Sequence, residues 1–120
     1  MFDCLARSCA DGFIGRVHAV RRTRAWRQVY RSLEHGFAKK ACRDNLVAGF
    51  GVDIQDFANA FANLQERRHA ADYDPHFKLT KSEVLSDIEL AADVIERFES
   101  MPISEKRGFA AHALFKSRPA

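Results

Sequence analysis

The chain has 120 residues, of which 47% are hydrophobic and 29% are charged, and its formal net charge at pH 7 is +3. This length fits one domain, residues 1–120, with a single modest core. No run of about eighteen apolar residues is present, so the sequence predicts no membrane-spanning helix and no membrane partner.

The residue types favour an all-α fold in a cytoplasmic protein. Alanine, leucine, phenylalanine, arginine and glutamate are frequent, and long alternations of β-branched residues are absent. Asp3 and Arg7 lie inside the only apolar stretch near the start, which argues against a secretory signal. Cys4, Cys9 and Cys42 are odd in number and lack close-paired metal spacing. We expect buried thiols, with a zinc site as the alternative, and no cofactor.

Charge is distributed unevenly along the chain. Residues 1–50 hold ten Lys/Arg against four Asp/Glu, which gives +6, whereas residues 51–120 hold nine against twelve, which gives −3. The basic excess is concentrated in Arg16, Arg21, Arg22, Arg24, Arg27 and Arg31. Such a cluster fits a phosphate-binding surface, a solvated helix start and loop, or a face directed at the acidic half of a partner subunit.

Two helices are expected before the middle of the chain. Residues 2–14 predict a first helix. Its apolar pattern is already under way at residue 2, as if the first turns of the helix were missing. A basic linker then leads to Thr23, which can cap a second helix over residues 24–34. The inward positions of these helices are Phe2, Leu5, Cys9, Phe13, Trp26, Val29, Tyr30 and Leu33.

Irregular structure is predicted next. His35-Gly36 indicates a break, residues 37–43 a short helical turn, and residues 45–51 a loop with two glycines. We interpret His35 as the polar end of the second helix, where a cation suits the helix dipole.

A central helix is predicted over residues 54–73. Asp53 can cap its start, and Pro75 ends it because the residue before a proline avoids helical dihedral angles. Phe57, Phe61 and Leu64 fall on one face of this helix, and Arg68 is the next position on the same line.

Two more helices complete the chain. Thr80 and Glu83 form a capping-box pattern that opens a helix over residues 81–100, and Ser104 starts a last helix. The core face predicted for the 81–100 helix is Leu85, Ile88, Ala92, Ile95 and Phe98. Short connections between long amphipathic helices favour an up-and-down antiparallel bundle of four to five helices.

The segment from Arg68 to Tyr73, Arg-His-Ala-Ala-Asp-Tyr, resembles the Arg-x-x-Ala-Asp-Tyr signature of bacterial HEPN-like proteins (higher eukaryotes and prokaryotes nucleotide-binding domain). Residues 2–5 resemble the end of the opening helix of these proteins, residues 29–36 their second helix, and residues 108–116 the closing helix of one subgroup. The similarity therefore covers nearly the whole chain.

This resemblance implies a helical bundle, often dimeric, whose motif faces a cleft near the two-fold axis. It also implies association with RNA, with nucleotides, or with a nucleotidyltransferase or antitoxin partner in toxin–antitoxin or defence systems. We therefore expect a non-catalytic binding or regulatory module. Its expected ligand-binding residues are Arg67, Arg68, Asp72, Tyr73 and His35.

A metal-independent ribonuclease toxin is the alternative function. Ribonuclease members of the resembled family carry an arginine and, after four to six residues, a histidine at the end of the central helix. No histidine follows Arg67 or Arg68 at that spacing, and His76 comes too late. Catalysis would need a changed geometry, with Arg68 stabilising the phosphorane charge and His69 or His76 transferring the proton.

Two further patterns have simpler interpretations. Arg68 and Asp72 can form an ion pair that fixes the helix end, with Tyr73 packed beside it. Arg107 and His112 have the nuclease spacing, but they lie in the last helix and such a pattern arises easily by chance in an arginine-rich chain.

A shortened first helix would leave apolar surface uncovered, and large exposed apolar patches usually mark an interface. We therefore expect a homodimer that buries the helix over residues 2–13 and places Arg68 near a shared cleft. The opposite charges of the two halves of the chain favour such an assembly.

Overall fold

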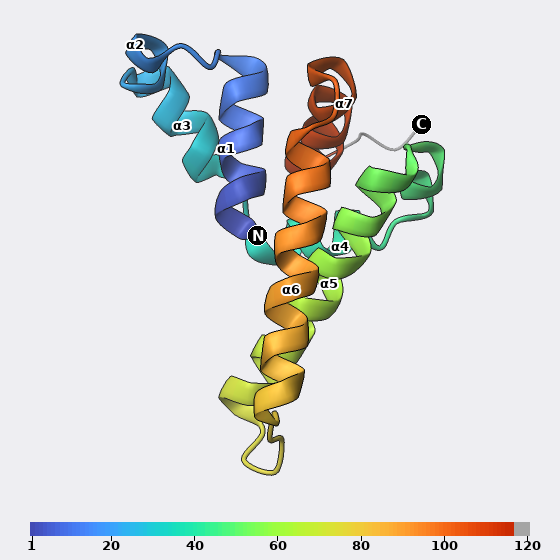
Figure 1. Cartoon of the computed structure of the whole chain (residues 1–120). Coiled ribbons are helices and arrows are strands. Elements are labelled where there is room, and N and C mark those ends of the chain that lie inside the picture. Colours follow the sequence, from blue (N-terminus) through green and yellow to red (C-terminus); the bar gives the residue numbers. More distant parts are fainter. Residues whose placement is uncertain (117–120) are drawn as a thin grey trace.

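The computed structural model describes residues 1–116, which form seven α-helices and one 3-10 helix, without a strand (Figure 1). The elements are α1 (Phe2–Phe13), α2 (His18–Arg21), α3 (Arg24–Ser32), α4 (His35–Cys42), η1 (Asn45–Gly49), α5 (Val52–Tyr73), α6 (Lys81–Glu99) and α7 (Ile103–Leu114). The all-α class is thus confirmed. Within the described part of the chain, no helix has the length and apolar character needed to cross a membrane.

Local capping sets several helix ends where the sequence predicts them. The Thr23 hydroxyl accepts a hydrogen bond from the amide of Trp26 at the start of α3, and Thr80 accepts one from Glu83 at the start of α6. Helix α5 ends at Tyr73, two residues before Pro75. At its other end the prediction is wrong, because α5 begins at Val52 and its cap is Gly51.

The segment around His35 also departs from expectation. Helix α3 ends at Ser32, and the backbone of Glu34 is extended before α4 begins at His35. His35 therefore lies at the positive end of a helix dipole, and the expected stabilisation of a cation there is wrong. The basic linker contains the short helix α2, and the predicted loop after Asp44 is the 3-10 helix η1.

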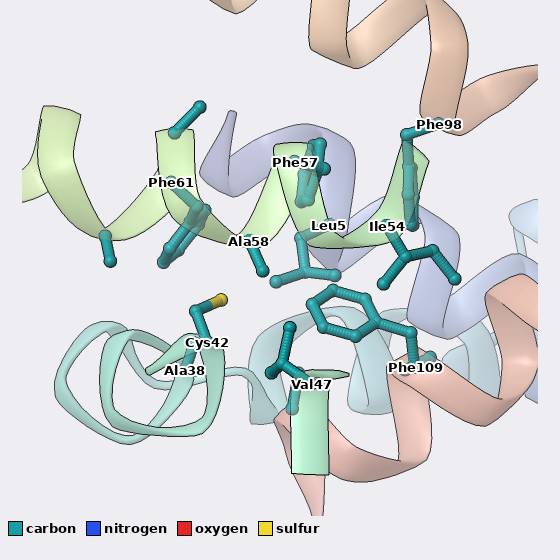
Figure 2. Close-up of a cluster of buried hydrophobic side chains, with 14 of the residues drawn as sticks. Leu5, Ala38, Cys42, Val47, Ile54, Phe57, Ala58, Phe61, Phe98 and Phe109 are labelled. Carbon is teal, nitrogen blue, oxygen red and sulfur yellow. The ribbon is translucent and has the colours of Figure 1, made fainter. Parts of the chain in front are cut away.

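Three phenylalanines form the centre of the core (Figure 2). Phe57 of α5 stacks on Phe98 of α6 with ring centroids 4.3 Å apart, and Phe109 of α7 meets both rings edge-on. Leu5 and Ile54, both fully buried, pack in the same cluster. The long helix α5 thus carries the core residues that join α1, α6 and α7.

The cysteines are free thiols, as the sequence suggests. Cys9 and Cys42 are buried in the core and Cys4 is half-buried. Burial raises the pKa of the Cys9 and Cys42 thiols to about 12 because a thiolate would lose its hydration there. Both thiols therefore remain protonated and inert near neutral pH.

The apolar face of helix α1 is buried within its own chain. Leu5, Ala6, Cys9 and Ala10 are fully buried, and α1 packs against α3 and α7. A second subunit is therefore not needed to cover this helix. The expectation that dimerisation buries residues 2–13 is corrected, and the apolar surface that stays uncovered lies elsewhere.

That uncovered surface is on the antiparallel pair α5–α6. We call Leu64–Ala91 the distal hairpin and the remaining described residues the body; the hairpin extends beyond the other helices (Figure 1). Phe98 is fully buried in the body, whereas Leu85 and Ile88 in the hairpin are 51% and 59% exposed. The predicted core face of α6 is therefore wrong for Leu85, Ile88 and the exposed Ala92, because no third helix of the described chain covers this end.

Two arginines clamp α5 and α6 together. In the distal hairpin, Arg67 Nε of α5 donates to Asp87 Oδ2 of α6 at 2.9 Å, and the same guanidinium is 3.4 Å from Glu83. In the body, Arg97 of α6 binds Asp56 and also Asp53, the residue expected to cap α5. These bridges fix the register of the pair.

Candidate binding groove

A groove of about 790 Å³ opens where the start of α1 meets the distal hairpin. We call it the Arg68 groove. Its apolar lining comes from three helices and includes Phe2, Phe61, Leu64, Val84, Ile88 and Ala91. Its polar lining includes His35, Gln65, Arg68, His69, Asp72 and Tyr73. Four of the five predicted ligand-binding residues therefore share one site, together with His69.

The Phe2 ring connects α1 to the wall of the groove. It stacks on the imidazole of His35, with centroids 3.7 Å apart and planes inclined by 11°, and it lies 6.5 Å from the ring of Phe61. His35 is thus held by an aromatic contact at the mouth of the groove. The sequence places His35 near the site but gives no sign of this contact, because it joins residues 33 positions apart.

Arg68 and Asp72 lie one turn apart on the groove face of α5 and are both exposed. Among residues 1–116, neither side chain has an ion-pair partner within 4.0 Å, so the predicted Arg68–Asp72 pair is absent. The physical reason is exposure: water solvates both charges, and an arginine before an aspartate is the weaker order for a helical pair. Both charges therefore remain available to a partner.

His69 and Tyr73 form a second pair on the same turns of α5. Their ring centroids are 4.6 Å apart, and the Tyr73 side chain is 76% exposed. Tyr73 is thus not packed against an Arg68–Asp72 pair as predicted. Instead it leaves an aromatic face at the groove, beside the imidazole of His69 one turn earlier on its own helix.

Gln65 supplies a polar atom that needs a partner. Its side-chain Oε1 is buried, and no hydrogen-bond donor reaches it within the part of the chain that the structure describes. A buried acceptor without a donor costs about 1–3 kcal/mol, so such atoms are rare in proteins and call for a specific explanation. Because Gln65 lines the groove, a bound partner can provide the missing N–H or O–H group.

Two predicted site residues lie outside the groove. Arg67 points at α6 and forms ion pairs with Asp87 and Glu83. It therefore joins the two helices of the hairpin and does not face the groove. His76 is in the exposed turn after α5, where its amide donates to Asp74 Oδ1. The structure therefore brings Arg68 together with His69 and His35, and it separates all three from His76.

The Arg107–His112 pattern has structural partners. Arg107 Nε donates to the carbonyl oxygen of Gly12 at 2.8 Å, which ties α7 to α1. His112 Nε2 lies 2.8 Å from the carbonyl oxygen of Ala41, which ties α7 to α4. These backbone contacts account for both side chains, and neither residue lines the Arg68 groove.

Sequence reasoning missed the contribution of α6 and of Gln65 to the groove. Val84 and Ile88 carry helical apolar spacing, which predicts burial but does not say whether the cover comes from the same chain. Gln65 has no distinguishing pattern in the sequence. Among residues 1–116, no group of three or more His, Cys, Asp or Glu side chains is placed to hold a metal ion.

Comparisons of this chain with protein-family models, with curated proteins and with solved structures give no match. The resemblance to HEPN-like proteins therefore remains an inference from the residues between Arg68 and Tyr73 and from the weaker similarities beside them.

Proposed function

We propose that this chain is a HEPN-like, non-catalytic binding module, and that its binding site is the Arg68 groove. One observation carries the proposal. The apolar stripe of α6 is buried at Phe98, yet it continues uncovered through Ile88 into the groove. Apolar side chains in a continuous stripe of this kind usually mark a surface that a partner covers.

The shape and lining of the groove favour a protein helix as the partner. The floor is apolar and lies between two antiparallel helices, which is the arrangement that accepts an amphipathic helix. Exposed Leu85, nearly one turn before Ile88, extends the apolar surface of α6 beyond the groove. A small ligand would leave this leucine in water, whereas a helix can cover part of it.

Charge points to a second copy of the chain as that partner. Arg68 and Asp72 lie one turn apart on the same face, with exposed Ala71 between them. When two α5 helices cross antiparallel about a two-fold axis at the level of position 70, Arg68 of each chain faces Asp72 of the other. Such a pattern is self-complementary, as a two-fold interface requires, and the small alanine permits a close approach.

Solution mass tests the interface. We expect a dimer at high micromolar concentration by light scattering, and Ile88→Glu should give a monomer because it puts a charge into the apolar floor. Leu46→Glu is the matched control, since Leu46 is 66% exposed on η1, away from the groove. A monomeric wild-type chain, or equal dissociation of both variants, would refute the second copy as partner.

A charge swap tests the contact itself. Arg68→Asp alone and Asp72→Arg alone should each weaken the dimer, because each places like charges opposite one another. The double variant Arg68→Asp/Asp72→Arg should recover most of the affinity, because it restores two opposite-charge pairs across the axis. Failure of the double variant to recover would exclude this pairing. If the wild-type chain is a monomer, the groove is left to a different protein, such as a nucleotidyltransferase or an antitoxin.

A ribonuclease is the second candidate, and one observation favours it. Arg68, His69 and His35 line the same groove, so a cation and two imidazoles surround one space. Within residues 1–116, however, no hydrogen bond links Arg68 to a histidine or orients either imidazole ring. We therefore expect no cleavage of a labelled single-stranded RNA in the presence of EDTA. Cleavage that His69→Ala abolishes would replace the binding proposal with catalysis.

A further inference from the structure

We propose that the outer face of α3 binds the phosphate backbone of a nucleic acid. This surface, the arginine stripe, consists of Arg24, Arg27 and Arg31, with Arg16 and Arg22 beside it in the sequence. None of these residues lines the Arg68 groove, and Figure 1 shows α3 at the opposite end of the molecule from the tip of the distal hairpin. The proposal is therefore independent of the groove and goes beyond the function assigned to it.

Helical geometry places the three arginines of α3 together. At 3.6 residues per turn, Arg24, Arg27 and Arg31 fall within an arc of about 60°. The inward residues Trp26, Val29 and Tyr30 lie on the opposite side of α3 and are partly buried. All three arginines are exposed, so their guanidinium groups form one positively charged edge.

Acidic neighbours do not neutralise this edge. No Asp or Glu occurs between Asp11 and Glu34 in the sequence. Asp11 is bidentate to Arg21, at 2.9 and 2.7 Å, and it also accepts the indole N–H of Trp26. Among the described residues, none of the arginines of the stripe, nor Arg16 or Arg22, has an ion-pair partner within 4.0 Å. Arg21 thus ties α2 to α1, whereas the arginines of the stripe, Arg16 and Arg22 can bind a ligand.

The apolar face of α3 distinguishes a nucleic acid from a membrane surface. An amphipathic helix binds a membrane by inserting its apolar face. Here that face packs on α1: Trp26 stacks on Tyr30 with centroids 5.3 Å apart, and the Tyr30 hydroxyl donates to Asp3. The exposed residues of α3 are arginines, Gln28, Ser32 and the small Ala25, which suits contact with phosphates and offers no large apolar side chain to insert.

The same packing predicts the mode of recognition. Trp26 and Tyr30 are committed to α1, so they are not free to stack on bases. Guanidinium groups bind phosphate oxygens with two parallel hydrogen bonds, which makes arginine a suitable residue for backbone contacts. Binding should therefore be independent of base sequence and strongly dependent on salt.

Titration with a labelled 20-nucleotide single-stranded RNA, repeated from 50 to 300 mM salt, tests the proposal; DNA of the same sequence and a duplex of each are run beside it. We define the salt slope as the decrease in the logarithm of the binding constant per tenfold increase in salt concentration. Each phosphate contact contributes about 0.7 to this slope for single strands. The triple variant Arg24→Gln/Arg27→Gln/Arg31→Gln should therefore lower the salt slope by about 2 and weaken binding about 10- to 100-fold at 0.1 M salt. The matched control, Lys40→Gln/Lys78→Gln/Lys81→Gln, removes three exposed charges elsewhere and should change binding less than 3-fold.

Charge-retaining lysine substitutions at the three positions should keep the salt slope and lose affinity by less than the glutamine variant does. Circular dichroism checks that every variant stays folded, and light scattering checks that the oligomeric state is unchanged. No RNA or DNA binding at 50 mM salt, or equal losses in the stripe and control variants, overturns the proposal. Binding to vesicles with 30% phosphatidylserine but to no nucleic acid assigns the stripe to a membrane surface and also overturns it.

Discussion

The body and the distal hairpin share the helices α5 and α6, but they use them differently. In the body, Phe57 and Phe98 meet at the centre of a core that α1 and α7 close. In the hairpin, the same two helices continue as a pair with Leu85 and Ile88 half exposed. One stripe of apolar residues thus stabilises the fold at one end and forms an open surface at the other.

The difference shows which forces hold each region. The body depends on buried apolar area, whereas the hairpin depends on the Arg67 bridges and on a narrow seam between two helices. Regions with few buried contacts open locally at lower free energy than the core does. We therefore expect substitutions in the body to change global stability and substitutions in the hairpin to change local opening and association.

Removal of a central ring should have the largest effect. Phe57→Ala leaves a cavity beside Phe98 and Phe109, and we expect it to lower the free energy of unfolding by about 3–5 kcal/mol. Urea denaturation followed by circular dichroism measures this change. A loss below about 1 kcal/mol would show that the phenylalanine cluster does not dominate the body.

High pH should weaken the body next. The pKa of the Cys9 and Cys42 thiols is raised from 9.0 to about 12 in the folded chain, so the unfolded chain releases these protons first. Their stabilising contribution is complete below pH 9 and is lost as pH rises toward 12, by about 1 kcal/mol per thiol at pH 10. Urea denaturation at pH 8 and pH 10 measures the loss. Cys9→Ala/Cys42→Ala should show a smaller difference between the two pH values; equal differences would contradict the assignment.

Loss of the distal clamp should have a smaller and more local effect. Arg67→Met keeps the apolar stem but removes both bridges, and exposed ion pairs of this kind contribute about 0.2–1 kcal/mol. Amide hydrogen exchange should therefore speed up in residues 64–91 and stay unchanged around Phe109. Uniform acceleration across the chain would mean that the hairpin and the body open as one unit.

The smallest effect is expected on the exposed side of α6. Leu85→Ser should change the free energy of unfolding by less than about 0.5 kcal/mol at low protein concentration, because Leu85 is 51% exposed. The same variant should weaken association at high concentration if a partner covers this face. A large loss of stability in dilute solution would show that Leu85 is buried in the monomer.

The sequence alone determined the helical class and many of the helix ends. Thr23, Thr80 and Pro75 act on the backbone within a few residues of themselves, so their effects can be predicted without knowledge of the fold. The inward faces of α1 and α3 follow from the same local periodicity. The segment from Arg68 to Tyr73 also stood out as a candidate site, because an apolar stripe that runs into opposite charges is unusual for a core, and four of its residues line the groove.

Tertiary structure decided which apolar residues are covered and which arginine is free. Periodicity assigns Ile88 and Phe98 to one face of α6, but only the positions of α1 and α7 decide that Phe98 is buried and Ile88 exposed. Arg67 and Arg68 are adjacent in sequence and about 100° apart around α5. Since α6 packs on one side of α5, Arg67 meets Asp87 while Arg68 faces the groove. Helical periodicity puts Arg68 on the apolar line of α5, but it does not say which of the two arginines is paired.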